Sequence, residues 1–492
     1  MKPRSLTELT FRGFAWTLVG TGGQSVVHAL AVVVLARLLA PEDFGVVGAA
    51  LVVIGFTQIF TRLGVGPAIV QMVGLTAHHV HVGFAISIML GATFALTVAA
   101  IAPLLATFFR MPDLEAVVRL LALTFPIAAV STVGSALLQR AMAFRALAAI
   151  QFVSQALGYG AVGITFAALG AGVWSLAYAQ LGQITLQALL VALARRDALG
   201  LAFSRPAAAR LLRFGAGFSL ARLANYAANQ ADNVVVGRGL GADALGAYGR
   251  AYQFMMLPAN LIGTVLDKVL FPAMASIQSD AERLSKAYLR ALGGVALVTM
   301  PAAAVLGITA PELVQVVLGP QWSAVVAPFQ VLVAFLVFRT GYKVSDALAR
   351  ATGAVYRRAW RQWVYAAAVT LGAWWGLVLG DTTGVAIGVG AAVALNFTLM
   401  LHLSITLTNV RWSQVASLLG RHLLIAVLVA MGAWSARAVA LALALPALGV
   451  LVVAAAASLL VWGALWWRLP SWFGHERSDL QGLIDRVRHR VR

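Results

Sequence analysis

Charged and amide side chains recur at helical spacing inside long apolar stretches of this sequence. Arg222, Asn225, Asn229 and Asp232 are separated by three, four and three residues, so a helix would carry them all on one face. An ionisable residue at the centre of a bilayer costs roughly 2.5–3.5 kcal/mol on insertion scales and marks a functional position by default. This stripe therefore predicts a hydrated binding surface inside a membrane.

A second stripe of the same kind lies further along the chain. Arg339, Lys343, Asp346 and Arg350 are separated by four, three and four residues and would also share one helical face. Arg binds phosphate through two parallel hydrogen bonds, and Lys binds it as a point charge. The chemistry this stripe favours is recognition of a phosphate-bearing ligand.

Basic side chains outnumber acidic ones among the residues expected at membrane depth. The predicted site has three groups: the cations Arg62, Arg222, Lys268, Arg339 and Lys343, the uncharged partners Gln24, His28, Asn225 and Asn229, and the acids Asp232, Asp267 and Asp346 as candidates for binding a coupling ion. A positive surplus of this kind suits an anionic substrate.

The alternative is that these residues are structural. Lys343 would then pair with Asp346. Arg222 would pair with Asp232 in the same way. Lys268 would extend its charged end to a membrane interface while its apolar stem stays in the bilayer.

The elements that carry these residues are predicted to be membrane-spanning helices. Of the 492 residues, 61% are hydrophobic and only 11% are charged, whereas soluble proteins are usually about 45–50% apolar and about 25% charged. A spanning helix needs about 20 mostly apolar residues. Apolar runs of that length predict an all-α polytopic membrane protein of about fourteen helices, at 14–39, 45–72, 80–107, 115–138, 147–169, 172–193, 212–237, 246–275, 288–310, 324–349, 359–379, 383–407, 420–440 and 443–467.

The connecting segments alternate in basic content. Clusters such as Arg140 with Arg145, and Arg357 with Arg358, fall in alternate loops, whereas the intervening loops hold scattered residues such as Arg37. One expected cytoplasmic loop, around His78, His79 and His81, has no Lys or Arg. Cytoplasmic loops of membrane proteins are enriched in Lys and Arg. We therefore expect a multi-pass protein of a bacterial inner membrane with both termini in the cytoplasm.

The two halves of the chain share a weak internal repeat. At one constant offset Arg37 aligns with Arg238 and Gly45 with Gly246, each pair between the first and second spans of a six-span half. The same offset places Thr21, Gln24 and His28 opposite Arg222, Asn225 and Asn229. Transporters are often built from such repeats, with the substrate site between the halves near the midplane. The sequence thus predicts two pseudo-symmetric six-helix lobes around a central cavity.

Several kinds of site are excluded by the residues themselves. The chain has no Cys, which rules out disulfides, thiolate metal sites and Cys nucleophiles. It has no Walker A motif, no HExxH and no Gly-x-Ser-x-Gly. The cluster His78, His79 and His81 is better explained as a solvated loop than as a metal site. We predict no enzyme activity, no cofactor, no metal and no nucleic-acid partner.

The motifs at the start of each half resemble those of a known family. In the first half they are LARLLAPEDFG at 35–45, FTRLG at 60–64 and AIVQ at 68–71; in the second they are YGRAY at 248–252, LP at 257–258, LFPAM at 270–274 and IQ at 277–278. They resemble the Wzx-like, WzxC-type polysaccharide exporters of the multidrug/oligosaccharidyl-lipid/polysaccharide transporter superfamily. The resemblance covers about the first 350 residues.

This resemblance implies a flippase that moves an undecaprenyl-pyrophosphate-linked oligosaccharide of O-antigen, capsule or exopolysaccharide to the periplasmic leaflet by alternating access. It implies a lipid-linked oligosaccharide and membrane lipids as ligands, and a glycan polymerase and other polysaccharide-assembly proteins as partners. The expected division is an N-terminal lobe at 1–200, a C-terminal lobe at 201–408, two further spans at 409–468 and a basic cytoplasmic tail at 469–492.

Two other functions remain open from the residues. A multidrug exporter of the same superfamily would take a cationic drug, which predicts a surplus of acid, and here the surplus is basic. A membrane glycan polymerase or ligase would need a large outer loop with catalytic residues, and every predicted outer loop is short.

Overall fold

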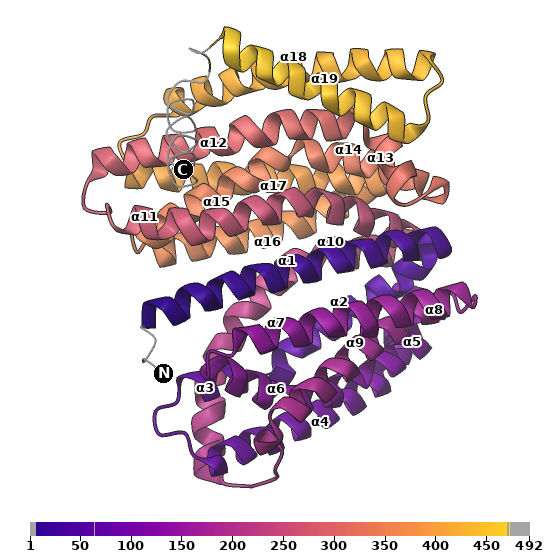
Figure 1. The fold of residues 1–492 in the computed structure, drawn as a ribbon, viewed down its shortest axis with the longest axis vertical. Helices are drawn as coiled ribbons and strands as arrows, with labels where there is room; N and C mark the ends of the chain where they lie inside the picture. Colours follow the sequence, from indigo (N-terminus) through magenta and orange to yellow (C-terminus); the bar gives the residue numbers. More distant parts are fainter. Residues whose placement is uncertain (1–5, 63, 470–471, 473–492) are drawn as a thin grey trace. The chain divides into compact units, whose positions relative to one another are not determined.

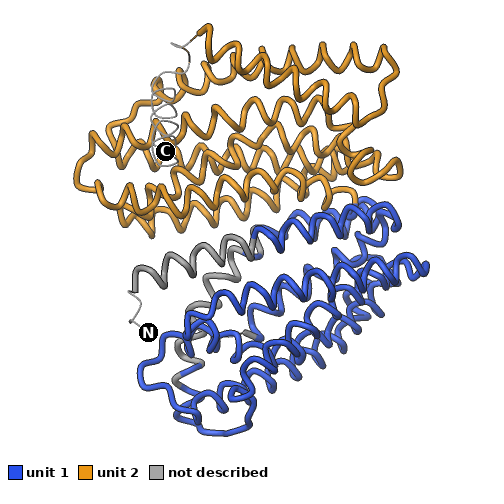
Figure 2. The backbone as a smooth tube through the Cα atoms, viewed as in Figure 1, with its two compact units in different colours: residues 1–246 blue, residues 247–492 orange. Residues whose placement is uncertain are grey.

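The computed structural model describes the backbone of residues 6–62, 64–469 and 472, and the side chains of residues 22–61, 64–209, 211, 226, 229–469 and 472. These residues form helices joined by short connections, with no strand in the described backbone (Figure 1). The chain divides into two compact units, Met1–Gly246 and Ala247–Arg492 (Figure 2).

The first unit is built from helices of very different lengths. They are α1 (Leu6–Leu38), α2 (Pro41–Arg62), α3 (Val65–Gln71), α4 (Ala77–Phe109), α5 (Leu114–Ala122), α6 (Thr124–Arg140), α7 (Phe144–Val153), the π-helical segment η1 (Ser154–Ala161), α8 (Val162–Ala168), α9 (Val173–Ala194) and the 3-10 turn η2 (Arg196–Ala198). Helix α10 (Arg205–Val265) then runs from the first unit into the second.

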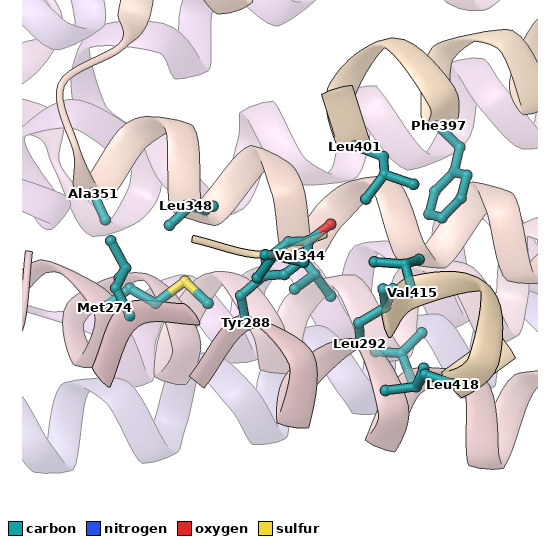
Figure 3. Packing of buried hydrophobic residues seen from close by; sticks show 13 residues of the cluster. Met274, Tyr288, Leu292, Val344, Leu348, Ala351, Phe397, Leu401, Val415 and Leu418 are labelled. Carbon is teal, nitrogen blue, oxygen red and sulfur yellow. The ribbon is translucent and has the colours of Figure 1, made fainter. Parts of the chain in front are cut away.

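The remaining helices lie in the second unit. Its helices are the π-helical segment η3 (Leu266–Leu270), α11 (Phe271–Ala275), α12 (Ala281–Ile308), α13 (Ala310–Val317), the 3-10 segment η4 (Pro320–Val325), α14 (Val326–Ala334), α15 (Leu336–Ala351), α16 (Val355–Val378), α17 (Thr382–Leu407), α18 (Trp412–Ala442) and α19 (Ala447–Arg468). Its core joins α11, α12, α15, α17 and α18 around Met274, Tyr288, Leu292, Val344 and Phe397 (Figure 3).

Ten helices of the described chain are long and apolar enough to cross a membrane, and eleven if the pair bent by 42° at 335 is one span. The prediction of an all-α multi-pass membrane protein is therefore confirmed. Three of the fourteen predicted spans are not among these eleven. Helix α10 contributes one candidate, Asn229–Ala275, although Gly241 interrupts its helical conformation with φ 87°. The described part of α1, Gly22–Leu38, is a shorter apolar helix.

Helix α16 accounts for the remaining difference, because Arg357, Arg358 and Arg361 lower the apolarity of its first two turns. Exposed tryptophans nevertheless stand near both ends of this helix, Trp360 and Trp363 at one and Trp374 and Trp375 at the other. Tryptophan is enriched at both membrane interfaces. We retain α16 as a predicted span on that ground.

Glycines bring α16 and α17 into backbone contact. A Cβ built on Gly372 would lie 2.5 Å from the carbonyl oxygen of Gly388, and one built on Gly376 would lie 2.5 Å from that of Gly384. Conversely, a Cβ built on Gly384 would overlap the carbonyl oxygen of Gly376, and one built on Gly388 would overlap that of Gly372. Small residues one turn apart permit this approach in membranes, where helices associate through packing.

A reciprocal contact joins the two repeat motifs inside the first unit. A Cβ built on Gly45 of α2 would overlap the backbone carbonyl of Ala242 in α10. A Cβ built on Gly246 would overlap the backbone carbonyl of Pro41. Gly45 aligns with Gly246 at the repeat offset, and Pro41 aligns with Ala242, so the contact is reciprocal between equivalent positions of the repeat.

Two loop arginines predicted to face the cytoplasm also have structural roles. Arg140 donates Nη1 hydrogen bonds to the carbonyl oxygens of Ile69 and Met72, both at 2.8 Å, and so satisfies the end of α3. The guanidinium of Arg195 donates from Nε to Asp197 at 2.8 Å and holds the pKa of that carboxyl below its ordinary value.

Candidate functional site

The first cation of the second stripe, Arg339, is buried in α15. Its side chain is 6% exposed, and Nη1 donates a 2.7 Å hydrogen bond to the hydroxyl of Tyr365 in α16. Its guanidinium carbon also lies 5.8 Å from the centre of the Tyr342 ring. These contacts fix the orientation of Arg339, so it acts as a positioned charge of the second unit.

Lys343 lies one turn further along the same helix. Its Nζ is 5.4 Å from the centre of the Tyr342 ring, and its aliphatic stem lies beside Gly263 of α10, where a built Cβ would be 3.6 Å from Cε. No carboxylate in the described chain pairs with Lys343. The alternative that Lys343 pairs with Asp346 is therefore wrong.

Asp346 instead belongs to a balanced network of two acids and two arginines. Arg350 places Nε 3.1 Å from its carboxylate, and Arg358 of α16 binds the other carboxylate oxygen. Arg350 also binds Asp267 in the π-helical segment η3. Two negative and two positive charges cancel in this network, so its carboxylates do not balance the charge of Lys343.

The remaining predicted residues are placed as follows. Lys268 lies beside Asp267 in η3 and is exposed. Asp232 is 2% exposed, and its Oδ1 accepts the backbone N–H of Asn233 at 3.0 Å. Asn229 is half-buried in α10. The side chains of Arg62, Arg222 and Asn225 lie outside the described residues.

In the first unit, Gln24 and His28 are half-buried on α1. His28 takes part in a polar chain that runs through Gln155 of η1 to Gln183 of α9. The sequence reasoning missed both glutamines because neither repeats at a stripe position. The available signal was the presence of amide side chains inside apolar runs, since Gln155 lies in 147–169 and Gln183 in 172–193.

The described residues contain no group of three or more His, Cys, Asp or Glu side chains close enough to hold a metal ion. The cationic residues of α15 are instead suited to hold an anion, since Lys and Arg are donors without acceptors. What this geometry can do is bind and release a charged group.

Two named transport and biosynthesis proteins match about two thirds of the chain. The chain is 29% identical over 327 residues to the succinoglycan biosynthesis transport protein ExoT of Rhizobium meliloti, a match covering 66% of this chain and 65% of ExoT. It is 27% identical over 334 residues to the lipopolysaccharide biosynthesis protein WzxC of Escherichia coli, covering 67% of each chain. The chain thus spans just under two thirds of the length of ExoT.

Solved structures give the fold. The lipid II flippase MurJ in an inward closed conformation superposes with a TM-score of 0.73 at 11% identity, covering 92% of this chain and 98% of MurJ. An inward-facing multidrug resistance MATE family transporter of the MOP superfamily gives 0.60 at 19% identity, covering 79% and 97%. At these low sequence identities the two comparisons show a shared fold alone.

The family follows from a model of polysaccharide biosynthesis proteins that matches residues 34–327, more than half of the chain. That match includes α2, the repeat contact at Gly45 and Gly246, and the π-helical segments of both units. The resemblance seen in the sequence motifs is thereby confirmed. The chain belongs to the polysaccharide biosynthesis protein family.

Proposed function

We propose that this protein is a flippase rather than an enzyme, and that it moves an undecaprenyl-pyrophosphate-linked oligosaccharide across the bacterial inner membrane by alternating access. Membership of the family and a fold shared with a lipid flippase support this. The observation that carries it is Lys343, a cation at membrane depth with no carboxylate partner among the described residues.

The balance of charge favours an anionic substrate. In the described part of α15, Asp346 is already bound by two arginines, whereas Arg339 is held by a tyrosine hydroxyl and Lys343 by a tyrosine ring. A phosphate that replaces water at Lys343 would form a charge-assisted hydrogen bond. A cationic drug would meet repulsion there, which argues against the multidrug exporter.

The finer layout belongs to this proposal as well. It comprises fourteen spans in two six-helix lobes, the division at 200 and 408, cytoplasmic termini, and a polymerase among the partners. One contact supports the placement of two helix ends on the same side. Glu312 of α13 and Arg437, near the end of α18, form an ion pair at 2.7 Å.

We expect Lys343→Gln to reduce the rate of flipping by about 10- to 100-fold. The reason is the loss of a charge-assisted hydrogen bond to the substrate, which contributes about 1.5–3 kcal/mol. The measurement is the rate at which lipid-linked oligosaccharide reaches the outer leaflet in proteoliposomes. Lys286→Gln is the matched control, because Lys286 forms an exposed pair with Glu282. Equal rates for the wild type and Lys343→Gln would refute the role of Lys343.

Deletion of the gene tests the function itself. Lipid-linked oligosaccharide is expected to accumulate on the cytoplasmic leaflet, and re-expression of the wild-type chain is expected to clear it. A normal lipid-linked pool with normal surface glycan in the deletion strain would overturn the proposed function.

A further inference from the structure

A chain of three polar side chains crosses the interior of the first unit. Gln183 of α9 donates from Nε2 to Oε1 of Gln155 at 2.8 Å. Nε2 of Gln155 in turn lies 3.1 Å from Nδ1 of His28 on α1. Gln155 is 3% exposed and stands in the π-helical segment η1, a type of segment that often marks functional sites.

The direction of these hydrogen bonds depends on the charge of His28. Because Oε1 of Gln155 accepts from Gln183, its amide nitrogen faces His28 and must donate. Nδ1 of His28 can accept that bond only when it carries no proton. With a proton on Nδ1, two N–H donors would face each other. The hydrogen bond then re-forms only if the Gln155 amide rotates by 180° and presents Oε1 to His28.

A turned Gln155 amide would present its nitrogen to Gln183, which must then turn its own amide to accept. Protonation of His28 on α1 thus reverses the donor and acceptor of both hydrogen bonds, as far as Gln183 on α9. The backbone cannot easily absorb the change by moving. A Cβ built on Gly158 of η1 would lie 2.6 Å from Cα of Gln183, so the two segments are already in close contact.

Within the described part of the first unit, α7, η1 and α8 pack on α1. Tyr159 of η1 places its ring centre 5.1 Å from the imidazole. Helix α7 contributes Arg145, and α8 contributes no ionisable residue. Gly23 of α1 faces Phe152 of α7, and Leu35 of α1 faces Gly163 of α8, so α1 runs parallel to these helices. Arg145 therefore lies roughly 18 Å from His28 along the helix axis.

We infer that His28 is a proton-binding site whose protonation reverses the hydrogen-bond chain through Gln155 to Gln183. Imidazole is the side chain whose ordinary pKa, about 6.5, lies within the physiological range. The proton comes from water and resides on Nδ1. As the coupling ion of transport, which rests on the proposed function, it would link proton entry to a rearrangement between α1 and α9.

The test is solid-state ¹⁵N NMR of the full chain in lipid bilayers with labelled histidine. The His28 signal is assigned by its loss in His28→Gln. At about pH 8 we expect an unprotonated Nδ1, and at about pH 5 a protonated one. Either a protonated Nδ1 at the higher pH or an unprotonated Nδ1 at the lower pH would overturn the inference.

Gln155→Glu sharpens this test, because a carboxylate can only accept. Nδ1 of His28 is expected to be protonated already at about pH 8 in that variant. An unchanged His28 signal in Gln155→Glu would show that the two side chains are not coupled. His402→Gln is the control, since His402 is an exposed residue of α17 and its removal is expected to leave the His28 signal unchanged.

Flipping in proteoliposomes supplies the second measurement. An imposed pH gradient is expected to accelerate flipping by the wild type and by His402→Gln, and to lose its effect in His28→Gln. A His28→Gln protein that still responds fully would sink the coupling role. If the wild type does not flip lipid at all, the proposed function fails, while the NMR result still decides whether His28 binds the proton.

Discussion

Gly388→Leu is expected to separate α16 from α17 and to prevent stable folding of the second unit. A side chain at this position has no space, since even a Cβ would overlap the carbonyl of Gly372. Overpacking usually costs about 1–3 kcal/mol and occasionally more, and a backbone carbonyl cannot rotate away. We expect a loss of about 3 kcal/mol or more, measured as thermal unfolding of the purified protein in detergent.

Gly294→Ala is the control for this experiment. Gly294 lies within α12, and a Cβ built there meets no described atom within 4 Å. Alanine is favoured over glycine in a helix by about 0.5–1 kcal/mol, so unchanged or increased stability is expected. If Gly388→Leu and Gly294→Ala unfold at the same temperature, the close approach of α16 and α17 is wrong.

Glu312→Ala is expected to have the second largest effect. Glu312 is 5% exposed and receives three hydrogen bonds of 2.7–3.0 Å from Arg437. Removing one partner of a buried ion pair costs about 3–5 kcal/mol, because the other charge is left buried. Arg437 is 25% exposed, so water compensates in part and we expect about 2–3 kcal/mol by thermal unfolding.

A double-mutant cycle with Arg437→Met separates the pair from other effects. The double variant is expected to be more stable than the sum of the single losses implies. Additive losses would mean that Glu312 and Arg437 do not interact. Glu282→Ala, which breaks only an exposed pair with Lys286, is expected to change stability by less than about 0.5 kcal/mol.

The helical architecture could be predicted from the sequence because apolar length alone decides it in a membrane protein. The loop from 237 to 246 was predicted as a break, and the chain does leave helical conformation at Gly241, although the helix continues on both sides. Helix α16 corresponds to the span predicted at 359–379. The sequence could not show how its glycines contact α17, because that depends on which helices become neighbours.

The candidate site was predictable in part. Spacing placed Arg339, Lys343 and Asp346 on one helix, α15, as observed. Spacing could not show that Asp346 prefers Arg358, since this residue belongs to the next helix and meets Asp346 only after α15 and α16 have packed. His28 was identified by the repeat, whereas Gln155 and Gln183 became visible only in the folded unit.

The crossing of α2 with α10 bears on the ancestry of the chain. In an isologous dimer, residue i of one copy touches residue j of the other, and j touches i. Gly45 with Ala242, and Gly246 with Pro41, have this form within one polypeptide. Duplication and fusion of a gene whose product paired with itself would leave such a contact. Within one polypeptide the two copies can then change independently, and the equivalent positions Pro41 and Ala242 already differ.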